Sequence, residues 1–192
     1  MKTVILASTS RYRAALLRQL HVPFEQAAPD CDESPLPDET PAALVTRLSL
    51  AKAQSLAAAH AGSLIIGSDQ VADLDGLVLG KPGDKARATR QLQTMRGKPV
   101  IFRTGLCLLD TSTGLARETS INTEAQFRDL SDAEIERYLD HDTPFDCAGS
   151  FKSEQLGISL LSAMRTDDPS ALIGLPLIAL AQMLREAGLD VP

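Results

Sequence analysis

The sequence of 192 residues has no Trp and few sulfur or imidazole side chains. Its three cysteines, Cys31, Cys107 and Cys147, are an odd number, lie far apart and form no CxxC pair. This pattern predicts neither a disulfide framework nor a zinc site, and reduced, buried thiols are expected instead. The three histidines are equally scattered, with no HExxH motif. We therefore expect chemistry that uses no His base and no His-bound metal.

The sequence also lacks a basic excess and a long apolar run. Lys and Arg number 19 against 25 Asp and Glu, which gives a formal charge of −6. Because binding to nucleic acid or to an anionic membrane needs a basic face, neither is an expected partner. The most apolar stretch, Ala171–Leu184, is interrupted by Gly174 and Pro176, which suits a buried helix better than a membrane span. With no targeting segment recognised, we expect a cytoplasmic protein.

The remaining composition is that of a soluble globular protein, with 44% hydrophobic and 23% charged residues. The charges are unevenly distributed, however. Residues 1–20 contain four basic residues and no acidic one, and residues 81–103 contain seven basic residues and one acidic one. These stretches suit a small polyanion, whereas the alternative is that they are solvated helix faces.

Apolar and β-branched runs alternate with helical patterns along the whole chain. Strands are predicted at residues 3–7, 24–28, 63–67, 71–74, 77–79, 100–109, 116–127 and 158–164, and helices at 11–20, 41–60, 84–95, 132–140 and 175–187. Asp75-Gly76 favours a two-residue hairpin turn, and Ser131 with Glu134 matches a capping box. The alternation predicts an α/β fold with a mixed sheet.

One turn suits phosphate. Ser8, Thr9 and Ser10 lie between the first strand and the helix that begins at Arg11. Such a turn offers hydroxyls, unpaired backbone N–H groups and the positive end of a helix dipole, all of which attract an anion. The alternative is that these hydroxyls are ordinary helix caps.

Known phosphate motifs and nucleophile motifs do not match. Gly76 and Gly80-Lys81 are one residue too close for a Walker A loop, and Pro82 stands where Ser or Thr is needed. Neither GxGxxG nor GxSxG is present at a strand end.

Asp69 and two lysines are the remaining candidates for chemistry. Asp69 follows a predicted buried strand, where a carboxylate is poorly solvated without a partner and where α/β sheets place ligands. A structural Asp that caps the next turn is the alternative. Lys52 lies at the edge of a helix's inner stripe and Lys81 follows the hairpin, and a solvent-facing position is the usual expectation for both.

Taken in order, several short segments resemble the Maf family of nucleoside triphosphate pyrophosphatases across essentially the whole chain. Within that family, Tyr12, Gln70 and Glu154 resemble the positions that set specificity in the branch acting on 7-methyl-GTP. Arg11 stands where the family usually has Pro, and Tyr12 where this branch more often has Trp. The segments that carry the resemblance are Leu6–Arg13, Asp32-Glu33, Ala51-Lys52-Ala53, Gly67–Val71, Gly80-Lys81-Pro82, Gly149–Glu154 and Gly174–Leu177.

The resemblance implies a Maf/ITPase-like α/β fold, with a mixed, elongated sheet and flanking helices. It implies one domain over residues 1–192, with a division into two lobes around an active-site cleft as the alternative. The implied reaction is hydrolysis of a nucleoside triphosphate, 7-methyl-GTP above others, between the α- and β-phosphates, with Mg²⁺ or Mn²⁺ and in a homodimer. The alternatives are the same chemistry on dTTP, UTP or a modified purine triphosphate, and a non-catalytic nucleotide-binding regulator of cell division.

The resemblance also assigns roles. The expected catalytic residues are Asp69, Glu33, Lys52 and Lys81, with Asp69 as the base that activates water and with Glu33 and Asp69 as the metal ligands. Hydroxyls and cations suit the triphosphate, which would be bound by Ser8, Ser10 and Arg13.

The base would be selected by three further residues. Tyr12 offers an aromatic face to the cationic 7-methylguanine ring. Glu154 could accept hydrogen bonds from the guanine N1–H and N2–H₂ edge, and Gln70 could donate or accept.

Overall fold

The computed structural model describes residues 2–191, which form two compact units. Unit 1 comprises residues 2–69, 104–121 and 168–191, and unit 2 comprises residues 70–103 and 122–167. The elements in chain order are β1 (Val4–Ala7), α1 (Arg11–Arg18), β2 (Phe24–Ala27), α2 (Pro41–Ser55), β3 (Leu64–Leu74), β4 (Leu77–Leu79), α3 (Lys85–Met95), β5 (Pro99–Asp110), β6 (Leu115–Phe127), α4 (Asp132–Asp142), the 3₁₀ helices η1 (Ala148–Ser150) and η2 (Leu156–Leu160), β7 (Leu161–Thr166), the 3₁₀ helix η3 (Pro169–Ile173), and α5 (Leu177–Glu186).

The strands form a mixed sheet, which confirms the predicted fold class. Their order is β2-β1-β3-β5-β6-β7, with β4 paired to β3. β1 runs parallel to both β2 and β3, whereas the β3–β4 and β6–β7 pairs are antiparallel. The long strands β3, β5 and β6 contribute residues to both units.

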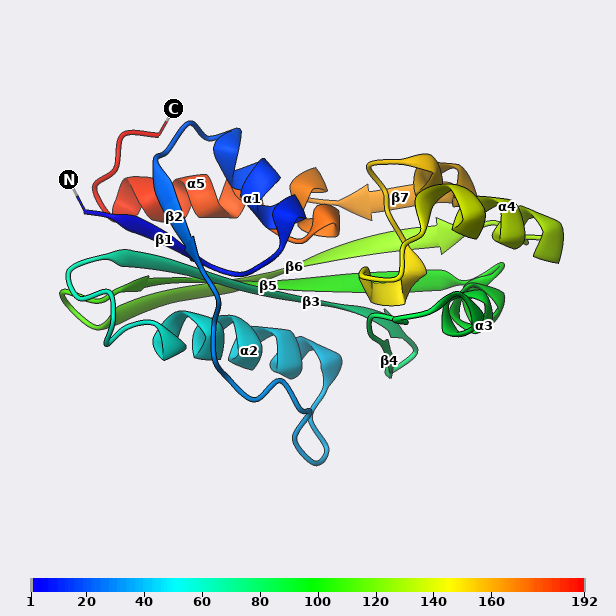
Figure 1. The fold of residues 1–192 in the computed structure, drawn as a ribbon, viewed down its shortest axis with the longest axis horizontal. Helices are drawn as coiled ribbons and strands as arrows, with labels where there is room; N and C mark the ends of the chain where they lie inside the picture. Colours follow the sequence, from blue (N-terminus) through cyan, green and yellow to red (C-terminus); the bar gives the residue numbers. More distant parts are fainter. Residues whose placement is uncertain (1, 192) are drawn as a thin grey trace. The chain divides into compact units, whose positions relative to one another are not determined.

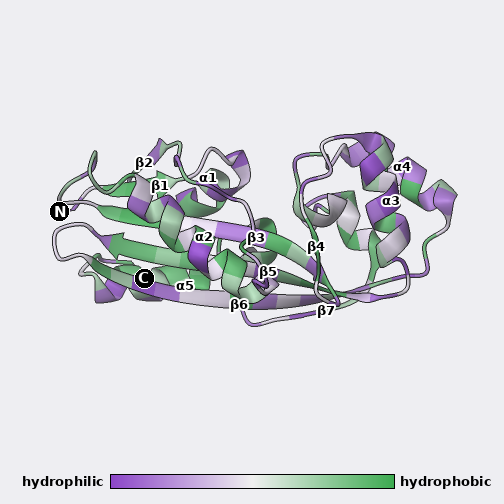
Figure 2. Cartoon of the chain, turned by 90° about the horizontal axis from the view of Figure 1, so that it is seen from below, coloured by the Kyte–Doolittle hydropathy of each residue, from purple (hydrophilic) through white to green (hydrophobic). Residues whose placement is uncertain are grey.

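In unit 1 the sheet is covered on both faces. Val4 and Leu6 pack in a cluster with residues of α1 and α5, while the alternate residues Ile5 and Ala7 pack with Ala53 of α2. Figure 1 shows α1 and α5 on one face of these strands and α2 on the other. A strand buried on both faces is apolar at every position, which is why β1 does not alternate. In Figure 2 β1 is accordingly coloured as hydrophobic, whereas hydrophilic residues recur along β6.

Unit 2 has an aromatic core beside a tight hairpin. Phe151 contacts both Phe102 and Phe127, with ring centroids 5.4 and 5.3 Å apart. The predicted hairpin is confirmed, since Asp75 (φ 51°) and Gly76 (φ 87°) both adopt the left-handed backbone that its turn requires.

Most elements occur where they are predicted, and the local signals explain why. Thr40 caps α2 with Pro41 at its first position, and the Ser131–Glu134 capping box opens α4. α2 nevertheless ends at Ser55 rather than near residue 60. The last predicted strand begins later, at Leu161, because η2 occupies residues 156–160.

The three cysteines are free thiols. Cys107 is fully buried, while Cys31 and Cys147 are partly exposed, so the expected burial is confirmed for one of the three. Within residues 2–191, no helix is long and apolar enough to cross a membrane.

Candidate active site

The Ser8–Ser10 turn connects β1 to α1 in unit 1. Ser10 is the N-cap of α1, and its side chain accepts a hydrogen bond from Arg13 N at 3.3 Å. Ser8 is buried, and its Oγ accepts hydrogen bonds from Ser10 N at 3.1 Å and from Arg13 Nη1 at 3.4 Å. The helix-cap alternative is therefore correct for Ser10, and the same hydrogen bonds give the turn a fixed shape.

A residue that the sequence did not single out, Gln26 of β2, also holds this turn in place. Its Nε2 donates to Ser8 O at 2.7 Å and, more weakly, to Ser10 O at 3.4 Å. Two carbonyls of the turn are thereby satisfied. Ser8 N donates to Leu6 O at 2.9 Å and Ser10 N to Ser8 Oγ, so the groups that can donate to an anion include the hydroxyl protons rather than these two N–H groups.

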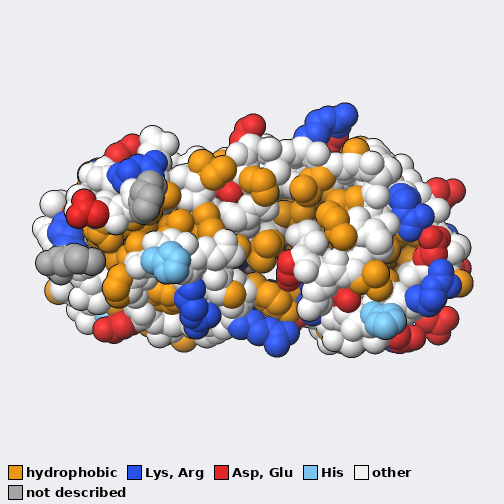
Figure 3. Space-filling model, turned by 90° about the horizontal axis from the view of Figure 1, so that it is seen from above, with side chains coloured by type: hydrophobic (Ala, Val, Ile, Leu, Met, Phe, Trp, Pro, Cys, Tyr) orange, Lys and Arg blue, Asp and Glu red, His pale blue; other side chains and the backbone are white. Residues whose placement is uncertain are grey.

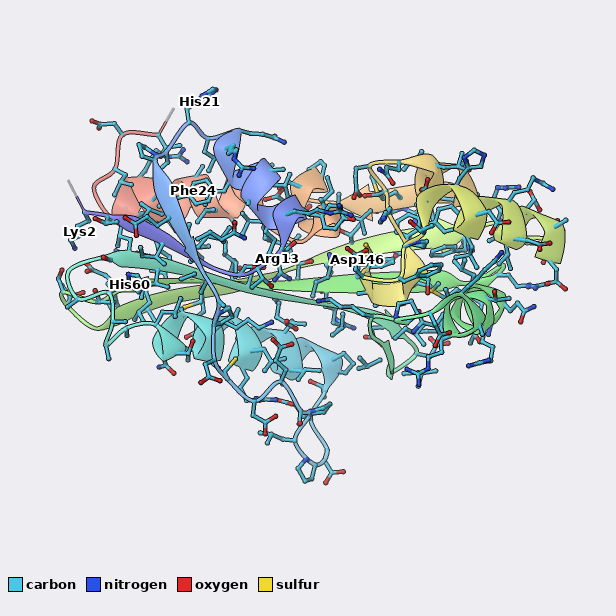
Figure 4. All side chains as sticks on the ribbon, in the orientation of Figure 1. Lys2, Arg13, His21, Phe24, His60 and Asp146 are labelled. Carbon is cyan, nitrogen blue, oxygen red and sulfur yellow. The ribbon has the colours of Figure 1, made fainter. Side chains whose placement is uncertain are left out.

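Arg13 is fixed at the N-terminal end of α1, where Figure 4 labels it. Its Nε donates to Gly174 O at 2.8 Å, and its Nη1 to Ser8 Oγ. Burial lowers the pKa of the Arg13 guanidinium, and the carboxylates of Asp69 and Glu33 oppose this shift. An arginine remains charged at neutral pH under such a shift, so Arg13 is a partly desolvated cation that these two carboxylates stabilise electrostatically.

Lys52, Asp69 and Glu33 form an ion cluster in the same unit. The Lys52 ammonium lies 2.6 Å from Asp69 Oδ1 and 3.0 Å from Glu33 Oε1. The Lys52 and Asp69 side chains are only 7% and 10% exposed, whereas that of Glu33 is 59% exposed. The solvent-facing alternative for Lys52 is therefore wrong, because its charge is buried against a carboxylate.

Two glycines explain how a helical lysine reaches a strand aspartate. A Cβ at Gly67 of β3 would overlap the carbonyl oxygen of Ser49, and one at Gly105 of β5 would overlap that of Val45. Both carbonyls belong to α2. The missing side chains let α2 approach the sheet closely, and this approach brings Lys52 to Asp69.

Asp69 is not at a strand end, as the sequence predicted, but in the middle of β3. The strand continues through these polar residues because their side chains find partners inside unit 1. The buried Ser68 hydroxyl is within hydrogen-bonding distance of Gly105 O (2.8 Å) and Gly174 O (2.9 Å), and Asp69 pairs with Lys52. No turn follows Asp69 for it to cap, so the turn-capping alternative is also wrong.

Tyr12 lies on α1 and is half-buried. The Arg11 guanidinium lies 4.9 Å from the centre of its ring and donates to its hydroxyl at 2.8 Å. The residue that departs from the family pattern therefore contacts the aromatic ring expected to receive the base.

Unit 2 carries the other three candidates. Lys81 and Glu154 are exposed, and Gln70 is partly exposed. The residue before Lys81 is held in place, because Gly80 O accepts hydrogen bonds from Gly149 N at 3.3 Å and from Gln91 Nε2 at 3.1 Å. The roles of these three residues stay predictions.

Much of the basic stretch at residues 81–103 is neutralised inside unit 2. Lys85 pairs with Asp140, Arg96 with Asp132, and Arg103 with Asp73. On the face drawn in Figure 3, basic and acidic side chains are interspersed rather than gathered by sign. The alternative of a solvated helix face therefore holds for Lys85 of α3. Arg103 instead lies on β5, and its pair with Asp73 is mostly buried, with side chains 20% and 6% exposed.

The acidic side chains set limits on a metal site. Within the described residues, no group of three or more His, Cys, Asp and Glu side chains is placed to hold a metal ion. Glu33 and Asp69 do, however, both pair with the Lys52 ammonium and so lie close together. Mg²⁺ commonly takes only one or two carboxylates together with substrate phosphates. This donor set fits a cation whose remaining ligands come from a bound phosphate chain.

The fold and this site define an α/β protein. One unit holds both a hydroxyl-rich strand–helix turn of the kind that suits phosphate (the phosphate-type turn, Ser8–Ser10) and the buried Lys52–Asp69 pair. Residues 3–187 match the family described as Maf-like protein. A 7-methyl-GTP pyrophosphatase of Cupriavidus metallidurans is 58% identical over 185 residues, covering 96% of this chain and 93% of that protein. One of Albidiferax ferrireducens is 53% identical over 190 residues, covering 99% and 96%. The chain belongs to the Maf family.

Among solved structures, the Ham1 protein of Staphylococcus aureus aligns over 67% of this chain and 73% of its own, at 13% identity and a TM-score of 0.49. This likeness is too low to carry an argument.

Proposed function

We propose that this chain hydrolyses 7-methyl-GTP between the α- and β-phosphates and releases 7-methyl-GMP and pyrophosphate. The observation that carries the reaction is the buried Lys52–Asp69 pair, whose carboxylate also acts electrostatically on Arg13 at the phosphate-type turn. The substrate comes from the relatives, which carry the name 7-methyl-GTP pyrophosphatase at 52–58% identity.

The triphosphate is assigned to the Ser8–Ser10 turn and Arg13. A nucleoside triphosphate carries about four negative charges, which hydroxyl and N–H donors alone do not balance. Arg13 supplies a fixed guanidinium, and its Nε is already bound to Gly174 O. The Nη groups are therefore the ones assigned to phosphate oxygens.

Asp69 is assigned as the base for the attacking water. Its Oδ1 is occupied by Lys52, so Oδ2 is the oxygen assigned to the water proton. The water oxygen bonds to the α-phosphorus, and the bond from the α-phosphorus to the oxygen that bridges it to the β-phosphorus breaks. The water proton passes to Asp69. Pyrophosphate leaves as the second product, and the Lys52 ammonium keeps the carboxylate oriented throughout.

Glu33 and Asp69 are the residues that would hold Mg²⁺ or Mn²⁺, together with phosphate oxygens. When bound, such a cation neutralises charge on the phosphates and polarises them. The partial exposure of Glu33 leaves it able to turn from Lys52 toward a ligand that arrives with the substrate.

Selection of the base is assigned to Tyr12, Gln70 and Glu154, and Lys81 is assigned as a further cation for the phosphates. The homodimer and the cytoplasmic location also stay proposals. Light scattering during size-exclusion chromatography measures the assembly, and a mass near 20.5 kDa in solution would contradict the dimer.

The testing experiment is a panel of nucleoside triphosphates, assayed for pyrophosphate with Mg²⁺, with Mn²⁺ and with neither. The expected result is metal-dependent turnover with 7-methyl-GTP preferred over GTP, dTTP and UTP. A preference for dTTP, UTP or a modified purine would support the first alternative. Tight nucleotide binding without turnover under any metal would support the non-catalytic regulator.

Asp69→Asn tests the base in the same assay, and Asp110→Asn is its matched control. Asp110 also pairs with a lysine, Lys2, at 2.5 Å. Lys2 lies before β1, whereas the phosphate-type turn lies after β1. Figure 4 accordingly shows Lys2 well apart from Arg13. We expect Asp69→Asn to abolish turnover and Asp110→Asn to retain it. Near-wild-type turnover by Asp69→Asn would contradict the assignment.

A further inference from the structure

The carbonyl oxygen of Gly174 connects Arg13, which is assigned to phosphate, to β3, the strand that carries Asp69. It accepts a hydrogen bond from Arg13 Nε at 2.8 Å, and the Ser68 hydroxyl lies 2.9 Å away. Ser68 immediately precedes Asp69 in β3. A carbonyl oxygen has two lone pairs, so Gly174 can accept from both donors at once.

Only glycine suits this position. Gly174 has φ 117° and ψ 8°, a backbone conformation that side chains rarely adopt. An added Cβ would also lie 3.3 Å from Arg13 Nε and 3.8 Å from Arg13 Cγ. Any substitution therefore strains the backbone and presses directly on the guanidinium.

The segment that presents this carbonyl is fixed on both sides. η3 precedes it and α5 follows it, and Asp168 binds both, since its carboxylate accepts from Ser170 N at 3.1 Å and from Ile178 N at 2.8 Å. The buried Thr104 hydroxyl donates to Ala171 O at 2.8 Å. A carbonyl held in this way is a rigid anchor for the flexible side chain of Arg13.

Ser68 contributes a second, weaker constraint. Its single hydroxyl proton is shared between Gly174 O and Gly105 O, which lies on the neighbouring strand β5. The side chain is fully buried, so water cannot replace either interaction. The position of Gly174 is thereby tied to the backbone of β3 one residue before Asp69.

We infer that Gly174 and Ser68 are positioning residues that hold the Arg13 guanidinium by its Nε, so that its Nη groups face the phosphate chain in register with Asp69. The inference rests on the proposed function only in taking the ligand of Arg13 to be phosphate. It gives the Gly174–Leu177 segment, which the proposed reaction does not use, a definite task.

Binding of inorganic pyrophosphate, measured by calorimetry with Mg²⁺ present, tests the inference without needing turnover. We expect Gly174→Ala to weaken binding about tenfold or more, as expected for loss of a well-aligned charge-assisted contact, and Ser68→Ala to weaken it less. In kinetics on 7-methyl-GTP, KM should rise more than kcat falls.

The matched control is Gly188→Ala. Gly188 also has a positive φ, 86°, but an added Cβ there would meet no atom within 4 Å. It should lose stability through the same backbone strain and bind pyrophosphate normally. Equal weakening by both variants would overturn the inference, because it would show a general effect of strain.

A double-mutant cycle with Arg13→Ala completes the test. If Gly174 acts through Arg13, Arg13→Ala combined with Gly174→Ala should bind no more weakly than Arg13→Ala alone. Additive losses would overturn the inference, as would wild-type protein that binds no pyrophosphate. If the wild-type protein binds pyrophosphate but hydrolyses no triphosphate, the proposed function is contradicted. The cycle then still decides whether Gly174 acts through Arg13.

Discussion

Replacing Lys52 by Met removes the ammonium that is hydrogen-bonded to Asp69 while keeping an unbranched side chain of similar length. Asp69 would then be a buried carboxylate without its cation, since its side chain is only 10% exposed. Removing one partner of a buried ion pair costs about 3–5 kcal/mol of unfolding free energy. Glu33 adds little to this cost, because at 59% exposure water can solvate it instead.

Removing the carboxylate should cost less than removing the ammonium. Asp69→Asn keeps an amide oxygen that can accept from Lys52, and Glu33 still lies 3.0 Å from the ammonium. The expected loss is about 1 kcal/mol, the usual net worth of one hydrogen bond. The double variant has no charge left on either partner, and we expect it to lose about 1–2 kcal/mol, less than Lys52→Met alone.

Urea unfolding at pH 7 and thermal unfolding measure these differences. For a domain of this size each kcal/mol corresponds to a shift of about 2–4 °C in Tm, so Lys52→Met should melt about 6–20 °C lower than the wild type. The double variant should recover a large part of that loss. A double variant destabilised by the sum of the two single losses would refute the reasoning, as would a Lys52→Met variant as stable as the wild type.

Three further predictions concern packing, acid stability and thiol reactivity. Gly67→Ala should cost about 3 kcal/mol and lower kcat, because its Cβ would push against the Ser49 carbonyl and move α2; a melting curve and a pyrophosphate assay check both effects. The hydrogen bonds from Arg47 lower the pKa of Glu39 from 4.5 to about 2. The Glu39–Arg47 pair therefore stabilises the fold fully above pH 4.5, and this stabilisation is lost as the pH falls toward 2. In Glu39→Gln the free energy of unfolding, measured by urea unfolding, should depend less on pH over this range. Burial raises the pKa of Cys107 to about 12, and mass spectrometry after iodoacetamide treatment at pH 8 should find it alkylated only after unfolding.

Local signals in the sequence were enough to predict most of the elements. Ser10 and Thr40 cap helices, and Asp75-Gly76 forms a hairpin turn, because each of these residues acts on its immediate neighbours. The residues of the phosphate-type turn could likewise be found from their position between a strand and a helix.

Non-local contacts explain what could not be predicted. Asp69 lies within β3 and not at its end, because partners from elsewhere in the chain satisfy Ser68 and Asp69. The burial of Lys52 depends on the close approach of α2 at Gly67. The hold of Gln26 on the turn depends on the parallel pairing of β1 with β2, which no spacing in the sequence reveals.

The central claim is that a water activated at Asp69 splits 7-methyl-GTP between its α- and β-phosphates. The most direct test is quantification of products from 7-methyl-GTP by ion-exchange chromatography, with wild-type protein and with Asp69→Asn. We expect equal amounts of 7-methyl-GMP and pyrophosphate from the wild type and none from the variant. Orthophosphate with 7-methyl-GDP, or undiminished product from Asp69→Asn, would contradict the account.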